Sequence, residues 1–438
     1  MKSYYPHGES GVADVRAQKA LWLLNHYALA PDMPGGTRHF DLGREMVKRG
    51  YDVTILASSF HHAQRQEMRL LGTDAAWKVE EVEGVRFVWL RTFPYRDNDW
   101  RRLVNMIDYK VRSYWLGRRL PQLGEQIPEP DVIIGSSVHL LAVLSAYLLA
   151  RHFGACFVME VRDLWPQTLV DMGLLGERHL LTWLLGGLER FLYRRAQRII
   201  VLLPKAREYI GSLGIDTSKV HWIPNGVNLS RFPMQETRGL VGDRFTVMYT
   251  GAHGLANGLD TVLDAAALLQ QEGWGGRIRF RLVGDGPEKP RLQQRSRDEG
   301  IEIVDFDEAV PKSQIHCLLQ EADALLMVLR DSAVFRWGVS PNKLFDYLAS
   351  ARPVIFGVSS PFNPIVEADA GFAIPPEDAR GMAEAIKRLA ALPAAERWEM
   401  ALRGRRYVEK HHDLARLADE LEQMLHELRG EECAPGRS

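Results

Sequence analysis

Short apolar runs alternate with helix-patterned segments along most of the chain, and this alternation constrains the fold more than any other feature. The first run, residues 20–24, leads through a polar, glycine-containing loop into a helical pattern, and a second run follows at residues 51–57. Short, mainly apolar runs of this kind are typical of parallel strands that are buried on both faces. Because consecutive parallel strands need a crossover connection, usually a helix, the sequence predicts an α/β fold.

The pattern occurs twice, on either side of a polar stretch at residues 233–242 that we interpret as a linker. A chain of 438 residues is expected to form two domains. We assign residues 20–235 to the first domain and 236–408 to the second, 1–19 to a flexible extension, and 409–438 to a C-terminal helix that packs back on the first domain and ends in a disordered tail. Two Rossmann-like domains that face each other enclose a cleft, which suits a nucleotide and a second substrate.

The composition is that of a soluble globular protein, with 46% hydrophobic and 25% charged residues. The formal net charge of −1 gives no general attraction to nucleic acid. The three cysteines have no metal-ligand spacing and favour a reducing, cytoplasmic compartment. Residues 1–19 lack the apolar centre of a signal peptide, and the uncharged run 132–150 is divided by glycine and serine into a strand and a helix, which disfavours a membrane span.

Residues 338–355 are patterned as loop, helix, turn and strand, and they hold the strongest candidate for a binding site. Ser340 can cap the helix, and Pro341 suits its first position. Lys343 and Asp346 lie three residues apart and share one face. The helix N-terminus and Lys343 would attract an anion, and Asp346 would accept hydrogen bonds from a sugar diol. An ordinary capped helix with a surface Lys–Asp pair is the alternative.

Three charged residues, Glu160, Arg162 and Asp163, stand at the end of another buried strand. Ligands of open α/β sheets bind at this edge, so we expect these side chains to contact substrate; a structural ion pair is the alternative. Gly35 and Gly36 follow the first strand and would let a ligand approach the backbone, unless they only form a turn.

Two further glycine clusters follow strands of the second half, at residues 251–258 and 284–286. Neither has the G-x-G-x-x-G spacing, which disfavours a nicotinamide dinucleotide. The segment 179–203 is rich in leucine and then in arginine. We interpret it either as a core helix or as a helix that docks on an anionic membrane surface.

The order and content of these segments resemble the retaining glycosyltransferases of family four, which have the GT-B fold: two facing Rossmann-like domains with an interdomain cleft. The resemblance extends from about residue 20 to residue 427. Its signatures are Pro-Gly-Gly-Thr-Arg at 34–38, Glu-Val-Arg-Asp-Leu-Trp-Pro at 160–166, Ile-Pro-Asn-Gly-Val-Asn at 223–228 and Ser-Pro-Asn-Lys-Leu-Phe-Asp-Tyr at 340–347. The last one is similar to a subgroup that builds bacterial surface polysaccharides and includes N-acetylfucosamine transferases.

The resemblance implies that the glycine loops and the 340s helix bind the donor. The implied positions are Gly35 and Gly36 at the diphosphate, Gly251 and Gly254 in the facing loop, Gly284, Asp285 and Gly286 near the nucleoside, and Ser340, Asn342 and Asp346 at the helix. Asp346 matches the second acidic residue of the family's E-x7-E motif, which holds the ribose hydroxyls.

Several positions depart from the family pattern. Gly338 stands where the first acidic residue of E-x7-E is expected, so the contact with the transferred sugar must differ. Ala252 and Asn257 replace an arginine and a lysine, which leaves Lys343 as our candidate for the diphosphate clamp. The alternatives for this clamp are Arg330 and Arg336.

Arg162 replaces a family histidine, so no histidine-based role is expected at its strand end. The expected catalytic residues are Lys343, Arg162, Asp163 and Glu160, the last three orienting the acceptor or donor sugar. We expect no cofactor besides the donor and no metal, because protein cations can stabilise the departing diphosphate. The loops at 61–77 and 93–114 are the expected acceptor pockets.

The implied function is transfer, with retention, of a hexosyl or N-acetylhexosaminyl unit from a UDP-sugar to a lipid-linked or oligosaccharide acceptor. The implied pathway is bacterial polysaccharide, lipopolysaccharide or glycoconjugate synthesis. We expect a cytoplasmic protein with a peripheral contact at the inner face of the plasma membrane. Two alternatives stay open: a sugar-nucleotide isomerase or hydrolase on the same fold, and a non-catalytic partner that binds a UDP-sugar.

Overall fold

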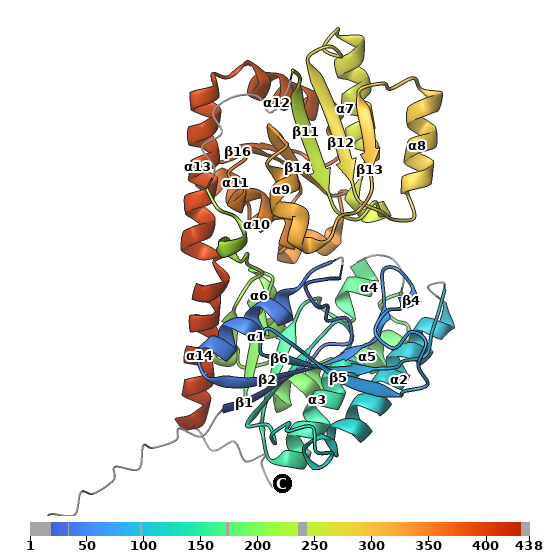
Figure 1. Cartoon of the computed structure of the whole chain (residues 1–438), viewed down its shortest axis with the longest axis vertical. Helices are drawn as coiled ribbons and strands as arrows, with labels where there is room; N and C mark the ends of the chain where they lie inside the picture. Colours follow the sequence, from blue (N-terminus) through green and yellow to red (C-terminus); the bar gives the residue numbers. More distant parts are fainter. Residues whose placement is uncertain (1–18, 34, 97–98, 172–174, 235–242, 431–438) are drawn as a thin grey trace, which may run out of the picture.

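The computed structural model describes residues 19–33, 35–96, 99–171, 175–234 and 243–430. Two α/β lobes, each built on its own sheet, are stacked along the long axis, and a helical segment runs along one side of both (Figure 1). The expected N-terminal extension, except its last residue, and most of the expected linker lie outside the described residues, as do the last eight residues of the chain.

The first sheet has the strand order β10-β9-β8-β7-β1-β2-β6-β5, and its neighbouring strands are parallel except for β5 and β6. Strand β1 lies near the middle of the sheet and is apolar from Ala20 to Leu24 because both faces are covered. Trp22 joins the core on one side and Leu23 the core on the other. The strands are β1 Lys19–Leu24, β2 Tyr51–Ser58, β5 Trp77–Val82, β6 Val85–Leu90, β7 Val132–Ser136, β8 Cys156–Val161, β9 Arg198–Val201 and β10 Val220–Trp222, with a separate hairpin of β3 Phe60–His61 and β4 Gln66–Glu67.

Helices cover both faces of this sheet. One face packs on α1 and on the C-terminal α14, and the other on α3, α5 and α6. The helices are α1 Arg38–Lys48, α2 Trp100–Gly117, α3 Leu140–Phe153, α4 Gln167–Asp171, α5 Leu180–Arg195, α6 Ala206–Ser212 and α14 Leu414–Gly430. The run 132–150 forms β7 and most of α3, as predicted, and no helix in the described ranges is long and apolar enough to cross a bilayer.

The second sheet is parallel, with the order β13-β12-β11-β14-β15-β16. Strand β13 begins at Val304, and Ile301 and Ile303 are buried in the turn before it, which explains their apolar character. The strands of this sheet are β11 Phe245–Thr250, β12 Ile278–Val283, β13 Val304–Asp307, β14 Ala324–Val328, β15 Val354–Gly357 and β16 Gly371–Ile374. The helices of the second lobe are α7 Asp260–Gln271, α8 Lys289–Asp298, α9 Ile315–Leu319, α10 Asn342–Ala349, α11 Pro364–Ala368, α12 Ala379–Ala391 and α13 Ala394–His411.

The segment around residue 227 meets the segment around residue 413, where the chain turns back toward the first lobe. The backbone N–H of Val227 donates to the carbonyl of His412 at 2.9 Å, and that of Leu414 donates to the carbonyl of Val227 at 3.1 Å. A Cβ at Gly226 would lie 2.5 Å from the carbonyl oxygen of His412, so only glycine permits this close approach. These paired segments fix the join between the lobes.

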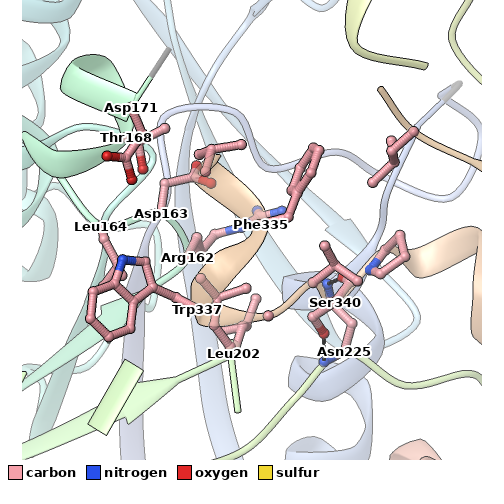
Figure 2. A pocket seen from close by; sticks show the side chains of 16 residues that line it. Arg162, Asp163, Leu164, Thr168, Asp171, Leu202, Asn225, Phe335, Trp337 and Ser340 are labelled. Atoms are coloured by element: carbon pink, nitrogen blue, oxygen red, sulfur yellow. Dashed lines mark hydrogen bonds between the residues drawn. The ribbon is translucent and has the colours of Figure 1, made fainter. Parts of the chain in front are cut away.

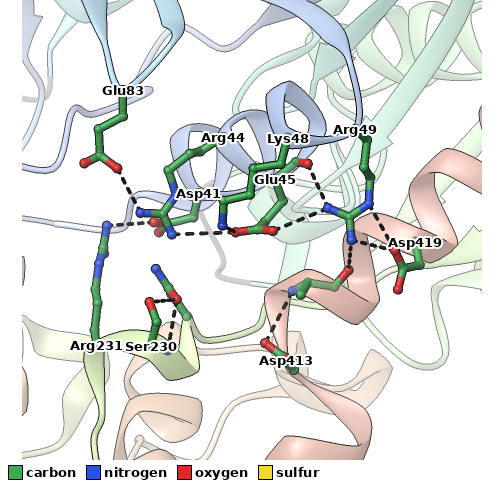
Figure 3. Close-up of polar contacts among 12 residues, drawn as sticks. Asp41, Arg44, Glu45, Lys48, Arg49, Glu83, Ser230, Arg231, Asp413 and Asp419 are labelled. Carbon is green, nitrogen blue, oxygen red and sulfur yellow. Dashed lines mark hydrogen bonds and ion pairs between the residues drawn. The ribbon is translucent and has the colours of Figure 1, made fainter.

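Beyond this join, α14 packs against α1 of the first lobe (Figure 3). Arg49 donates to the Asp419 carboxylate at 2.5 Å and to the Ala415 carbonyl at 2.8 Å. Leu417 and Leu421 are buried in the same core as β1 and β2. Because the ion pair is partly exposed, the apolar contact contributes most of the stabilisation.

Candidate functional site

A cleft of about 250 Å³ lies between the two lobes and opens to solvent (Figure 2). Its first-lobe wall comes from the residues after β8, from α4 and from Asn225. Its second-lobe wall is the segment 334–341, which precedes α10. The carboxyl ends of β8 and β14 thus face the same space, where open α/β sheets bind their ligands.

Arg162 and Asp163 lie on the cleft wall, where they were expected (Figure 2). Ser137 shapes the turn that carries them, because its hydroxyl accepts from the Arg162 backbone N–H at 3.0 Å. The carboxyl end of β8 therefore presents a cation and a carboxylate to one open volume.

Glu160 does not join them on the cleft wall. Its carboxylate is buried under α1, where it accepts from Arg38 Nε at 2.8 Å and lies 2.6 Å from His39 Nε2. Burial alone would raise the pKa of Glu160, but His39 and Arg38 outweigh it and hold the pKa well below its ordinary value. Side chains alternate along β8, and that of Glu160 lies on the α1 face of the sheet. Of the three charged residues, only Arg162 and Asp163 line the cleft.

The first glycine loop meets the start of α10 across the lobes. A Cβ on Gly36 would lie 2.5 Å from Nδ2 of Asn342, and Gly35 has a φ of +132°. Both glycines are exposed, so their backbone is open to a ligand. The structure therefore brings Gly36 of the first lobe and Asn342 of the second together, and the donor role of this pair stays a prediction.

The two glycine clusters of the second lobe pack against each other. A Cβ on Gly284 would lie 1.9 Å from the Gly251 carbonyl oxygen, and one on Gly286 would lie 2.5 Å from the His253 carbonyl oxygen. The His253 N–H donates to the Asp285 carbonyl at 2.8 Å. Gly284 and Gly286 are thus required for the contact between the turns, whatever they do toward a ligand.

Lys343 lies beside the first of these turns, and a Cβ on Gly251 would approach its Nζ to 2.9 Å. The ammonium donates to Tyr249 Oη at 2.8 Å and to Asn257 Oδ1 at 3.4 Å, and it lies 4.0 Å from the centre of the Tyr249 ring. Both hydrogen-bond partners are neutral, and burial lowers the pKa of Lys343 to about 7. An anion placed here would supply the missing counter-charge.

Asp346 is buried and forms an ion pair with Lys312 in a small pocket that also includes Asp41 and Arg231. The last two residues are paired with each other at 3.0 Å. Asp346 and Lys343 therefore have different partners, and the alternative of an ordinary surface Lys–Asp pair is wrong.

Ser340 was expected to cap α10, but the helix begins at Asn342, and its N-cap residue, Pro341, makes no side-chain cap. The Ser340 hydroxyl instead accepts from the Asn225 backbone N–H at 3.0 Å, and its carbonyl accepts from Asn225 Nδ2 at 2.5 Å. Ser340 therefore binds the Asn-Gly turn that precedes the join between the lobes and does not cap the helix.

Gly338, at the position of the missing acidic residue, lies at a contact between the lobes. A Cβ there would come within 2.5 Å of the Pro204 ring, and its φ is +106°. The neighbouring Arg336 donates to Asp171 of α4 at 3.0 Å. Arg330 is paired with Glu377 at 3.3 Å, so Lys343 is the candidate clamp with no carboxylate partner among the described residues.

Sequence reasoning missed three residues of this region: Asp171, Lys312 and His253. Asp171 and Lys312 have no local signal, because only the approach of distant segments makes them relevant. The His253 ring is fully buried beside the glycine turns, and neither ring nitrogen has a hydrogen-bond partner among the described residues. No group of three His, Cys, Asp or Glu residues suited to a metal ion occurs in the described ranges.

Two family models match the chain. Residues 35–226 match the glycosyl transferase 4-like domain, and residues 244–391 match glycosyl transferases group 1. WcaI of Escherichia coli, named for glycosyl transfer in colanic acid biosynthesis, is 22% identical over 383 residues, which cover 83% of this chain and 90% of WcaI.

Solved structures share the arrangement of the lobes. Sucrose-phosphate synthase of Thermosynechococcus elongatus aligns with a TM-score of 0.71 at 16% identity, over 94% of this chain and all of that one. HepE of Anabaena, solved with UDP and glucose, aligns with a TM-score of 0.66 at 14% identity, over 94% of this chain and all of HepE. These likenesses confirm the predicted GT-B fold.

Proposed function

Because the chain belongs to the GT4-like, group 1 glycosyltransferases and is related to transferases of bacterial exopolysaccharides, we propose that it moves a sugar from a UDP-sugar to a lipid-linked or oligosaccharide acceptor with retention of configuration. The observation that carries this proposal is the ammonium of Lys343, which is held against a glycine turn by neutral groups only. The UDP complexes of HepE make UDP the nucleotide to test first.

We place the donor diphosphate between Gly251, Lys343 and the start of α10. The α10 N-terminus has no side-chain cap, so its backbone N–H groups can bind phosphate oxygens. Gly35 and Gly36 would approach the same phosphates from the first lobe. Negative charge develops on the diphosphate as the C–O bond breaks. Hydrogen-bond donors that are already in place before the reaction stabilise this charge best.

The nucleoside would lie toward Asp285, with its ribose at Asp346. Asp346 is paired with Lys312, so a ribose diol must either replace this lysine or share the carboxylate with it. Each carboxylate oxygen can accept more than one hydrogen bond, and sharing keeps the buried charge compensated.

We place the transferred sugar and the acceptor beside Arg162 and Asp163. With Gly338 in place of the acidic residue, the backbone of residues 338–340 is what the second lobe offers to the sugar hydroxyls. The family resemblance implies that the departing phosphate helps to deprotonate the acceptor, so these two side chains orient the sugars. An N-acetylfucosamine or other N-acetylhexosaminyl donor, and a site of action on the cytoplasmic face of the membrane, belong to this proposal.

A thermal-shift panel of nucleotide sugars tests the donor assignment, since a ligand of the folded state raises the melting temperature by mass action. We expect UDP-sugars to shift it and GDP-sugars to shift it less. The absence of any shift at millimolar concentration would refute the proposal. Release of UDP without acceptor would favour the hydrolase class, and binding without turnover on lipid extracts would favour a non-catalytic partner.

A further inference from the structure

Helix α2 has an apolar stripe on its outer face. Trp100, Leu103, Ile107, Val111 and Trp115 recur every three to four residues and are 40% to 64% exposed. A surface helix normally turns its one apolar face to the core. The inner face of α2, with Met106 and Tyr109, already does this, so the stripe is a second apolar face that the described chain leaves uncovered.

The N-terminal half of α5 adds to this surface. Leu180, Leu181, Trp183 and Leu184 are exposed, which overturns the core interpretation for this half, whereas Leu192 near the other end is buried. Of the seventeen exposed large apolar side chains in the described ranges, ten lie on α2 and α5.

The two helices lie on the same side of the first sheet, with α3 between them (Figure 1). Helix α2 follows β6, and α5 follows β8 and α4, so both begin at the carboxyl edge of the sheet, where the cleft lies. We call the exposed stripe of α2 and the four residues of α5 the α2–α5 face.

The charge of α2 indicates what this face binds. The cations Arg101, Lys110 and Arg112 of the helix lie away from the core, whereas Arg102 is half-buried beside Tyr27. The single acid of the helix is Asp108, although the whole chain has a net charge of −1. The guanidinium of Arg101 lies 5.5 Å from the centre of the Trp100 ring, and that of Arg118 lies 5.4 Å from the Trp115 ring. Tryptophan beside cations suits the headgroup region of an anionic bilayer.

We propose that the α2–α5 face docks the protein on the surface of an anionic phospholipid bilayer. The apolar side chains enter the headgroup boundary, and Arg101, Lys110 and Arg112 contact lipid phosphates. A second copy of the chain fits less well, because a two-fold contact would oppose like charges. The inference rests on the proposed function in one respect: docking by this face brings the mouth of the cleft to a lipid-linked acceptor.

Flotation of the full chain with vesicles tests the surface. Vesicles of phosphatidylcholine with phosphatidylglycerol should bind the wild type, and phosphatidylcholine alone should bind it much more weakly. The double variant Ile107→Ser/Val111→Ser should bind the anionic vesicles at least about tenfold more weakly, since it removes several methyl and methylene groups that would enter the lipid. Val366→Ser is the matched control, since this valine is exposed on α11 of the other lobe.

The charge contribution has its own variant, Arg101→Gln/Lys110→Gln, which should lower binding to anionic vesicles about tenfold or more and leave the weak binding to neutral vesicles unchanged. Wild-type protein that ignores anionic vesicles, or stripe variants that bind like wild type, would overturn the proposal. A lipid-free dimer that dissociates in the stripe variant would assign the face to self-association instead.

UDP-glucose binding is measured in parallel without lipid. All these variants should bind it like wild type, because none lies at the proposed donor site. Vesicle binding without nucleotide-sugar binding would refute the proposed function but keep the docking surface. Nucleotide-sugar binding without vesicle binding would refute the docking surface but keep the proposed function. The two proposals can therefore fail separately.

Discussion

The ammonium of Lys343 should make the affinity for a sugar diphosphate depend on pH. Its pKa of about 7 in the free protein reflects burial without a carboxylate partner. A bound diphosphate raises this pKa, so binding takes up a proton wherever the free lysine is neutral. Affinity is therefore fully present below the free pKa and is lost as the pH rises through it.

The magnitude follows from the same value. If only the protonated lysine binds well, a pKa of about 7 makes the affinity for UDP-glucose about tenfold weaker at about pH 8 than at about pH 6. UDP-glucose is the proper ligand because its diphosphate, unlike the terminal phosphate of UDP, does not titrate near neutrality. Isothermal titration calorimetry in two buffers of different ionisation enthalpy measures both the affinity and the proton uptake.

Lys343→Met is the matched variant, since it keeps an unbranched apolar stem and removes the charge. A charge-assisted hydrogen bond contributes about 1.5–3 kcal/mol, so we expect affinity at about pH 6 to fall roughly 10- to 150-fold and the pH dependence to vanish. A flat profile for the wild type, or the same slope in the methionine variant, would show that another group binds the diphosphate.

Four further variants test other parts of the site. Asp346→Ala should weaken UDP-glucose binding by about tenfold or more in calorimetry, because a ribose hydroxyl loses its acceptor; unchanged affinity would place the ribose elsewhere. Glu160→Gln should lower the free energy of unfolding by about 3 kcal/mol or more in urea titrations, because it breaks a buried ion pair. Asp163→Asn should instead lose turnover with little change in stability. The opposite pattern would show that Glu160, and not Asp163, acts at the substrate. Gly338→Glu should lower the melting temperature by several degrees through its clash with Pro204, and a gain of activity would contradict the contact described here.

The fold could be predicted because its signals are local. The alternation from residue 20 onward reflects strands with two buried faces, and the Asn-Gly turn and the 340s helix are contiguous motifs. The places of Lys343, Gly251 and Gly36 also follow, since each lies next to a strand end or a helix start.

The partners of these residues could not be predicted, because they come from segments far apart in sequence. Nothing near Glu160 indicates that Arg38 and His39 enclose its carboxylate, and nothing near Asp346 indicates Lys312. Ser340 shows the same limit: its preference for a helix cap is real, but Asn225 of the other lobe offers two hydrogen bonds. The stripe of α2 could not be predicted, because its period is that of a core helix and only the exposure of its side chains in the folded chain distinguishes the two.

The return of α14 to the first lobe has a consequence for biosynthesis. Residues Leu417, Leu421 and Met424 complete a core whose other members lie in the first sixth of the chain and in the strands that follow. During translation, the first lobe cannot complete its core until the whole second lobe has been synthesised, and one face of its sheet stays exposed to solvent until then. Nascent chains arrested before residue 414 should therefore expose this face of the sheet to chaperones, and deletion of the residues from 414 onward should unfold the first lobe.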